Sequence, residues 1–316
     1  MADITATDDV TWDQAAYDRL TYFAFRPENY FDRFATVRAT RQSMPGSSVV
    51  FDKTADLSVA SSAIDESSDI DAVTLSNSPV TVTLAEYGNA VLATAKLRAT
   101  SYLAVDPVIA NVIGQNAGIS IDTVARAAFL GGSNVLYGGA ATDRDEVTPA
   151  DTITGAKFRR IRAELAAASV PRIGGFYVAM LHPDQVYDLR GETDLAGWRA
   201  PKVYSNPAQI DMGTIEAFEG FMVFESPRVP VLADAGSSTT LTDVYQSVFF
   251  GAQAVAKGHS VSGGYGANPV FVATPVTDKL RRFIGMGWKH LVGYAKFRDE
   301  SLWRLETASS IGANAA

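Results

Sequence analysis

The stretch Pro79-Val-Thr-Val-Thr-Leu-Ala-Glu-Tyr-Gly88 decides how the first third of the chain is organised. Its apolar and polar residues alternate from Val80 to Leu84, which predicts a strand with one buried face. An earlier run, Val49-Val-Phe51, predicts a second short strand. Between them, residues 54–78 are rich in Ser, Asp, Ala and Thr, and their apolar residues are spaced singly. We therefore predict a long two-stranded arm that lies on another molecule, because its connecting loop is too polar to form a core.

Two helices are predicted further along the chain. Asp106-Pro107 is typical of a helix start, with an acidic N-cap followed by proline, and the helical pattern runs to Gly131-Gly132. Thr154 is predicted to cap a second, amphipathic helix. The apolar face of this helix consists of Phe158, Ile161 and Leu165.

Most of the remaining apolar runs predict strands, and no internal repeat is visible. The predicted strands are Phe176–Leu181, Gly220–Phe224, Val244–Phe250 and one or two strands between Phe283 and Glu306. A short helix is predicted to open at His182-Pro183 and to end at Gly191. This order of elements indicates the α+β class, with sheet and helices segregated along the chain.

The composition excludes several classes of protein. The 316 residues contain no cysteine, so disulfide frameworks, thiolate metal sites and cysteine nucleophiles are excluded. No apolar run approaches the ~18 residues of a membrane helix, and the polar, acidic N-terminus is not a signal peptide. No nucleophile elbow, phosphate loop or dinucleotide-binding motif is found, and the three histidines lack metal-pair spacing. We therefore expect no catalytic residue, cofactor, metal or membrane partner.

The charge is distributed unevenly. Residues 1–150 carry a net charge of −9 and residues 151–316 a net charge of +1, for a total of −8. Residues 54–95 contain six acids and no base. Charge alone favours a role in solubility. The alternative is that the acidic segment of one copy faces a basic surface of another copy. The candidate basic residues are Lys157, Arg159, Arg160 and Arg162.

The first forty or so residues are unusually aromatic, and arginines and aspartates are interleaved with the aromatic residues. We predict that this segment packs on the subunit's own body or on a neighbour, because a free tail with so much aromatic surface would be sticky. The candidate contact residues are Trp12, Tyr17, Arg26 and Arg33.

Four stretches, in this order, resemble the major capsid proteins of tailed bacteriophages, which have the Hong Kong 97-type fold. They are the stretch 79–88, Ile121-Asp122 in the long helix, the segment Gly213–Pro227, and Gly285-Met-Gly-Trp-Lys289 with the strands that follow it to Glu306. The similarity is greatest to the branch grouped with the coat protein of the N-four phage. It covers nearly the whole chain.

The resemblance implies a division into five segments. Residues 1–46 form an N-terminal arm and residues 47–95 an extended loop. Residues 96–150 form the first part of a peripheral domain, which contains a long spine helix. Residues 151–270 form an axial domain, and residues 271–316 supply the closing strands of the peripheral domain.

The implied function is self-assembly, as hexamers and pentamers, into an icosahedral head shell that encloses double-stranded DNA without sequence-specific binding. The implied location is the virion, with assembly in the cytoplasm of the bacterial host. The implied partners are a portal, a separate scaffolding protein (the chain shows no long charged helical prefix) and, in some shells, a decoration protein. Some relatives cross-link a lysine of the extended loop. Lys53 is the only lysine before residue 96, and nothing local indicates activation. We therefore predict a non-covalent shell.

Three alternatives stay open at this point. They are an encapsulin-like nanocompartment shell with the same fold, a soluble α+β binding or enzymatic domain, and another virion component such as a tail protein. On the leading interpretation, the predicted intersubunit contacts are Trp12, Tyr17, Arg26, Arg33, Asp65, Glu66, Asp69, Asp71, Arg159, Arg160 and Arg162.

Overall fold

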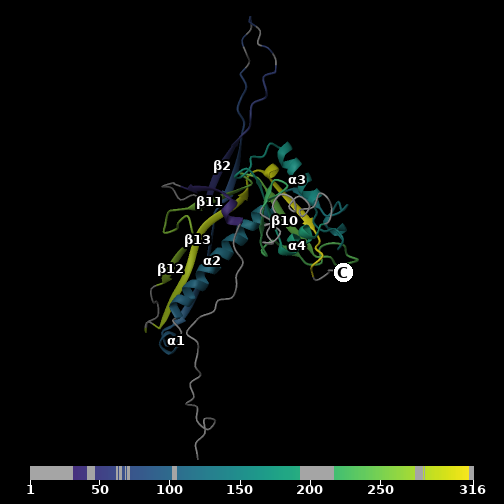
Figure 1. Ribbon diagram of the computed structural model, residues 1–316. Helices are drawn as coiled ribbons and strands as arrows, with labels where there is room; N and C mark the ends of the chain where they lie inside the picture. Colours follow the sequence, from purple (N-terminus) through teal and green to yellow (C-terminus); the bar gives the residue numbers. More distant parts are fainter. Residues whose placement is uncertain are drawn as a thin grey trace, which may run out of the picture. The chain divides into compact units, whose positions relative to one another are not determined.

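The computed structural model describes residues 31–40, 47–61, 63, 66–67, 69, 72–101, 105–192, 217–274, 280 and 282–312 (Figure 1). The described chain forms two compact units. Unit 1 consists of the described residues within 88–117 and 271–289. Unit 2 consists of those within 31–87, 118–270 and 290–312. The five functional segments expected from the sequence are a separate division of the chain and stay a prediction.

The main sheet of unit 2 is mixed. Its strands follow the order β5-β14-β10-β6-β8-β7, and β9 also pairs with β10. The strands are β5 (Asn134–Tyr137), β14 (Leu302–Thr307), β10 (Val244–Phe250), β6 (Tyr177–Leu181), β8 (Phe221–Glu225), β7 (Ala217–Phe218) and β9 (Val231–Leu232). Every residue of β6 and β10 is buried. The sequence of β6 is continuously apolar. Strand β10 also buries Gln246 and Ser247, whose side chains hydrogen-bond to Glu306 and Gln185.

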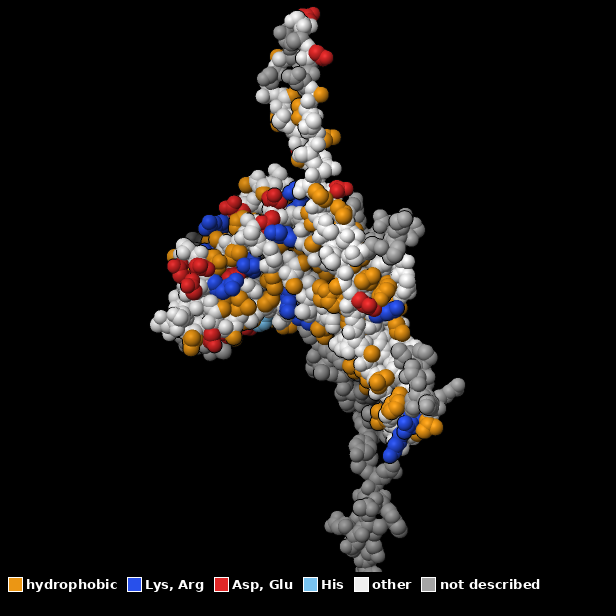
Figure 2. Space-filling view, turned by 180° about the vertical axis from the view of Figure 1, so that it is seen from behind, with side chains coloured by type: hydrophobic (Ala, Val, Ile, Leu, Met, Phe, Trp, Pro, Cys, Tyr) orange, Lys and Arg blue, Asp and Glu red, His pale blue; other side chains and the backbone are white. Residues whose placement is uncertain are grey.

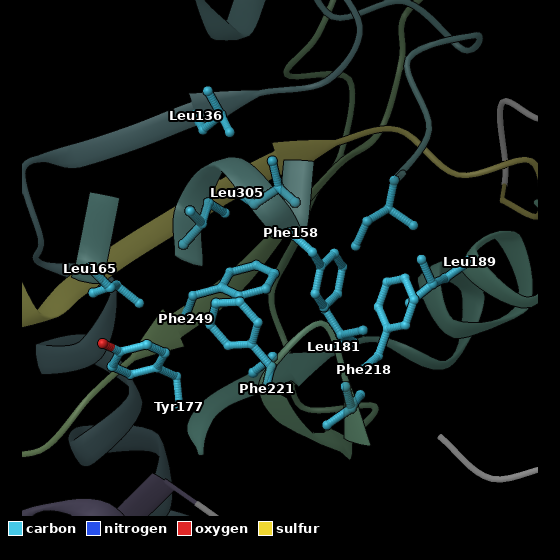
Figure 3. Packing of buried hydrophobic residues seen from close by; sticks show 14 of the residues in the cluster. Leu136, Phe158, Leu165, Tyr177, Leu181, Leu189, Phe218, Phe221, Phe249 and Leu305 are labelled. Atoms are coloured by element: carbon cyan, nitrogen blue, oxygen red, sulfur yellow. The ribbon is translucent and has the colours of Figure 1, made fainter. Parts of the chain in front are cut away.

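Helices α3 (Gly155–Ala167) and α4 (Pro183–Gly191) lie beside this sheet (Figure 1). The predicted apolar face of α3 is confirmed, because Phe158, Ile161 and Leu165 are all fully buried. Figure 3 shows the ring of Phe158 with the rings of Phe249 and Phe221 on one side and the ring of Phe218 on the other. Its ring centroid lies 4.9 Å from that of Phe249 and 5.7 Å from that of Phe221, with interplanar angles of 85° in both pairs. Such edge-to-face contacts fix α3 on the sheet.

The predicted helix caps are only partly correct. Thr154 occupies the N-cap position of α3, but its side chain accepts no capping hydrogen bond. The carboxylate of Glu192 accepts from the Gly155 N–H instead, at 2.9 Å, a partner that the local sequence does not reveal. The predicted start of α4 at His182-Pro183 is confirmed, and the His182 side chain caps the helix by accepting from the Asp184 N–H, a contact that was not predicted.

The long helix α2 (Val105–Leu130) ends immediately before the predicted Gly131-Gly132. It begins at Val105, one residue before the predicted Asp106 cap, so Asp106 lies inside the helix. In unit 2, Phe129 of α2 packs on Phe250, with ring centroids 4.8 Å apart. In unit 1, Asn116 of α2 accepts a hydrogen bond from Trp288 Nε1 at 2.9 Å. Both halves of the helix are therefore attached to strands.

A second sheet is centred on a long strand that both units share. Its strands are β1 (Thr36–Thr40), β11 (Val255–Ser260), β13 (Phe283–Lys296), β12 (Val270–Thr274) and β4 (Ala85–Thr94). β1 is parallel to β11, and β11 is antiparallel to β13. β4 leads into the short helix α1 (Ala95–Thr100) of unit 1, where the Ala95 N–H donates to the Arg282 carbonyl at 2.7 Å.

Strands β2 (Ser48–Thr54) and β3 (Asn77–Thr83) form the predicted two-stranded arm, in a register that pairs Phe51 with Val80. Its buried side chains Val49, Phe51 and Val82 pack against Ala256 of β11. All described residues between the two strands are exposed. The hairpin therefore has a packed base and a loop without a core, as the sequence predicts.

Candidate assembly surfaces

The loop between β2 and β3, residues 55–76, is here called the outer loop. The large apolar side chains of its described residues are uncovered, with exposed fractions of 55% for Leu57, 88% for Val59, 65% for Val73 and 69% for Leu75. Figure 2 shows orange apolar side chains along the loop and red acidic ones toward its far end. Because the subunit itself leaves this surface uncovered, the outer loop is suited to contact another molecule.

The base of the hairpin packs closely against the second sheet. A Cβ on Gly258 would lie 2.8 Å from Val49 Cγ2, and one on Gly293 would lie 2.1 Å from the Thr83 carbonyl oxygen. Both glycines therefore allow the hairpin to approach the second sheet closely. Lys53, at the end of β2, pairs with Glu300 at 3.5 Å. The Lys53 ammonium therefore makes an ordinary ion pair within its own subunit.

The predicted acidic residues lie in the outer loop. Glu66 and Asp69 are exposed there. Asp65 and Asp71 lie outside the described residues. The predicted contact between these acids and a basic surface of another copy stays a prediction.

The predicted basic residues lie together on the exposed side of α3. Arg159, Arg160 and Arg162 are all exposed. Arg159 reaches Glu219 at 4.0 Å, a long and solvated ion pair. A Cβ on Gly220, whose φ is +83°, would lie 2.9 Å from Nε of Arg162, so this glycine leaves room for the guanidinium. The structure thus places three cations on one accessible helix.

The residues predicted for the N-terminal arm are mostly outside the described part of the chain. Trp12, Tyr17 and Arg26 lie there. Arg33 is described, and it is exposed in the short helix η2 (Phe31–Phe34).

Asp122 of α2 holds helix η2 in position. From the sequence, this residue was predicted to lie in the long helix, but no contact was predicted for it. Its carboxylate accepts the Phe31 N–H at 2.8 Å and the Arg228 Nε–H at 2.8 Å, and its exposed fraction is 1%. Arg228 also donates to the Ile119 carbonyl at 2.9 Å. The side chain of Phe31 is fully buried beside Phe129, with centroids 5.8 Å apart. This junction fixes where the preceding residues join unit 2.

A second ion pair, between the buried Lys257 and the partly exposed Asp32, holds η2 to the sheet. Lys257 of β11, whose exposed fraction is 6%, donates to Asp32 at 2.6 Å. The Tyr294 hydroxyl donates to the same carboxylate oxygen at 2.5 Å. Burial, followed by the charge of Asp32 and this hydrogen bond, raises the pKa of Tyr294. The tyrosine is therefore a fixed donor at physiological pH.

The described residues offer no sign of metal chemistry or of a membrane span. No group of three or more His, Cys, Asp or Glu side chains in this part of the chain could hold a metal ion. Among the same residues, no helix combines the length and apolar character needed to cross a bilayer.

A comparison with protein families identifies this molecule. The family described as phage capsid protein matches residues 10–311. The chain belongs to this family. The predicted function of major capsid protein of a bacteriophage is thereby confirmed, and the protein is a structural component of the virion shell. No curated protein matches the chain.

Solved structures of phage capsids share the fold of this capsid protein. The capsid of Ralstonia phage GP4 matches with a TM-score of 0.78 and 17% identity, over 99% of this chain and 100% of that one. The capsid of cyanophage Pam1 matches with a TM-score of 0.74 and 14% identity, over 99% and 100%. The capsid of cyanophage P-SCSP1u matches with a TM-score of 0.73 and 15% identity, over 97% and 95%. The predicted Hong Kong 97-type α+β fold is confirmed.

Proposed function

We propose that this capsid protein self-assembles as hexamers and pentamers into an icosahedral head shell that encloses double-stranded DNA, and that it belongs to the N-four-like branch. The observation that carries the proposal is the outer loop, with its tightly packed base and its uncovered apolar side chains. A closed shell of one chain repeats a few heterologous contacts, so each subunit needs a projecting surface and a different surface that receives it.

The receiving surface in this proposal includes the exposed side of α3. Residues 54–95, which include the outer loop, carry six acids and no base, and α3 presents Arg159, Arg160 and Arg162. Each exposed ion pair contributes little, at most about 1 kcal/mol. Matched charges repeated around the shell nevertheless select the register of the contact. The N-terminal arm, with Trp12, Tyr17, Arg26 and Arg33, supplies a further contact with a neighbour.

A shell that encloses DNA implies several further partners. The shell receives DNA through a portal, assembles around a separate scaffolding protein in the host cytoplasm, and in some forms binds a decoration protein. It contacts DNA without reading its sequence. We also propose that no covalent cross-link joins the subunits, because Lys53 lies in an ordinary solvated ion pair with Glu300 and lacks the dry surroundings that activation of its amine would need.

The proposal is tested by expressing the full chain alone and with candidate scaffolding proteins, and imaging the products by electron microscopy. Neutralising Asp65, Glu66, Asp69 and Asp71 together is expected to reduce the yield of closed particles. Subunit stability should be unchanged, because the described members of this set are exposed. The matched control is Asp145→Asn, which removes an exposed acid outside the outer loop.

A charge exchange sharpens this test. Replacing the four acids with lysine, and separately the three arginines of α3 with glutamate, should each impair assembly. Combining the two changes should restore part of the lost yield, because the contact is again between opposite charges. Normal particles from the neutralised variant would contradict the charge pairing. A monodisperse monomer under all conditions would contradict the shell, and a ladder of covalent multimers from boiled particles would contradict the non-covalent contact.

A further inference from the structure

Unit 1 leaves most of its large apolar side chains uncovered. Among its described residues, Ile113 and Trp288 are the only large apolar residues whose side chains are buried. The exposed ones are Val91, Leu92, Leu97, Val112, Phe271, Leu280 and Phe283. A surface with this much apolar exposure is typical of a site that another molecule covers.

Part of this surface combines apolar and basic side chains, and we call that part the unit 1 face. It consists of Leu92 of β4, Lys96 and Leu97 of α1, Arg282, and Phe283 at the start of β13. β4 pairs with β13, and the bond from the Ala95 N–H to the Arg282 carbonyl joins α1 to the same place. All five residues are exposed, Leu92 by 72%. Figure 2 shows orange and blue side chains next to one another at the end of unit 1 that carries α1.

The unit 1 face belongs to a basic part of an acidic chain. Residues 88–117 and 271–289 contain six lysines or arginines and two aspartates, a net charge of +4, whereas the whole chain has a net charge of −8. Such a surface attracts an acidic partner and repels a second unit 1 face. The partner also needs apolar side chains, because Leu92 and Leu97 would otherwise stay in water.

Residues 1–18 have both properties. They contain five aspartates and no lysine or arginine, together with Trp12 and Tyr17. Aromatic rings also attract ammonium and guanidinium groups to their faces. This segment lies outside the described residues, and the twelve residues between Asp18 and Phe31 span up to about 40 Å when extended. That length exceeds the diameter of a small domain, so the segment of one subunit can reach another subunit.

We propose that the unit 1 face of one subunit binds residues 1–18 of a neighbouring subunit. The aspartates lie against Lys96 and Arg282, and the aromatic side chains cover Leu92 and Leu97. This docking rests on the proposed contact between the N-terminal arm and a neighbour, and it adds the surface that receives the tip of the arm. The outer loop, which is also acidic and apolar, is the competing occupant.

Carbodiimide cross-linking, which forms an amide between a carboxylate and a nearby lysine amine, tests the docking. A mixture of isotope-labelled and unlabelled full chain is assembled, cross-linked and digested, and the linked peptides are analysed by mass spectrometry. The expected product joins an aspartate of residues 1–18 to Lys96, in pairs that combine the two labels. Links from Lys96 to Glu66 or Asp69 in its place, or links confined to peptides of equal label, would overturn the proposal.

Substitutions that keep Lys96 show whether its surroundings bind the segment. Arg282→Glu and Leu92→Ser should each lower the yield of the link at least about fivefold, because each removes part of the matching surface. The matched controls are Arg172→Glu and Val261→Ser, which change an exposed arginine and an exposed valine of unit 2 and should leave the yield unchanged. An equal yield in the variants and the controls would contradict the docking.

Electron microscopy of the same samples separates this docking from the shell itself. Closed particles that lack the link would overturn the docking and leave the proposed shell intact. If no closed particles form, the proposed shell fails, and the docking is judged in the oligomers that the chain does form. The mixed-label link supports the docking there, and its absence overturns it.

Discussion

Replacing Asp122 with alanine should lower the free energy of unfolding of unit 2 by about 3–5 kcal/mol. The carboxylate is buried, accepts the Phe31 N–H, and pairs with Arg228, whose side chain is only 10% exposed. The substitution therefore leaves a buried guanidinium without its counter-ion and a buried backbone N–H without an acceptor. An unpaired buried charge and an unsatisfied buried N–H each destabilise the folded state by more than the intact interaction stabilises it.

A graded series separates the charge from the hydrogen bond. Asp122→Asn keeps an oxygen that can accept from Phe31 but loses the charge opposite Arg228. We expect it to cost about 1–3 kcal/mol, less than the alanine variant. Arg228→Met leaves the carboxylate buried and unpaired and should cost about as much as Asp122→Ala. The double variant Asp122→Asn/Arg228→Met should lose clearly less than the sum of its two single changes, because no charge is left unpaired.

The assay is urea unfolding of the unassembled full chain, followed by circular dichroism and tryptophan fluorescence. Asp145→Ala is the control, since this aspartate is exposed in the short helix η3 (Arg144–Glu146), and it should change the free energy of unfolding by less than about 0.5 kcal/mol. A loss below about 1 kcal/mol in Asp122→Ala, or strictly additive losses in the double variant, would refute the reasoning.

Three further changes test other parts of the fold. Burial raises the pKa of Glu306, but hydrogen bonds from two side chains and two neighbouring arginines outweigh it and hold the pKa below its usual value. Glu306→Gln should therefore destabilise the chain at pH 7 in urea unfolding, with a difference that shrinks as the pH falls below 4.5, because the unfolded carboxylate takes up protons before the folded one does. Gly293→Ala places a methyl 2.1 Å from a carbonyl oxygen of β3 and should lower the melting temperature, whereas Gly114→Ala, with open space around it in α2, should raise it slightly. Val59→Ser with Val73→Ser should leave the melting temperature unchanged and lower the particle yield seen by electron microscopy, because both side chains are uncovered in the subunit.

The elements with a strong local pattern were predictable from the sequence. Helix α3 shows three apolar residues at helical spacing, and the structure buries all three. Strand β6 is a continuous apolar run, and every residue in it is buried. In each case the pattern within a few residues reports the environment, because burial is set by the apolar side chains themselves.

Strand β11 shows why other elements were not predicted. Its sequence, Val255-Ala-Lys-Gly-His-Ser260, contains three polar residues and a glycine, and it resembles a loop. Its lysine can be buried because a carboxylate 225 residues earlier in the chain neutralises it. Its glycine is required because Val49 of the hairpin packs against the strand. Neither condition leaves a local signal.

The candidate assembly surfaces, which stay a prediction, carry a sequence signal of a related kind. The uneven charge points to the outer loop and to α3, since a run without bases and a cluster of arginines are visible directly in the sequence. Asp122 gives no comparable signal, because one aspartate in a helix does not show that Arg228, 106 residues later, will reach it. The sequence thus locates exposed charges well and buried, paired charges poorly.

The acids of the outer loop also explain how an uncovered apolar loop can exist on a subunit before assembly. Outer loops of two copies would otherwise associate through side chains such as Val59 and Leu75, which are more than two thirds exposed. Because the segment from residue 54 to residue 95 carries six acids and no base, two such loops repel each other. A basic surface is free of that repulsion. On the proposed pairing with a basic surface, the acids would therefore disfavour contact between two outer loops as well as favour the intended contact, which a role in solubility alone does not require.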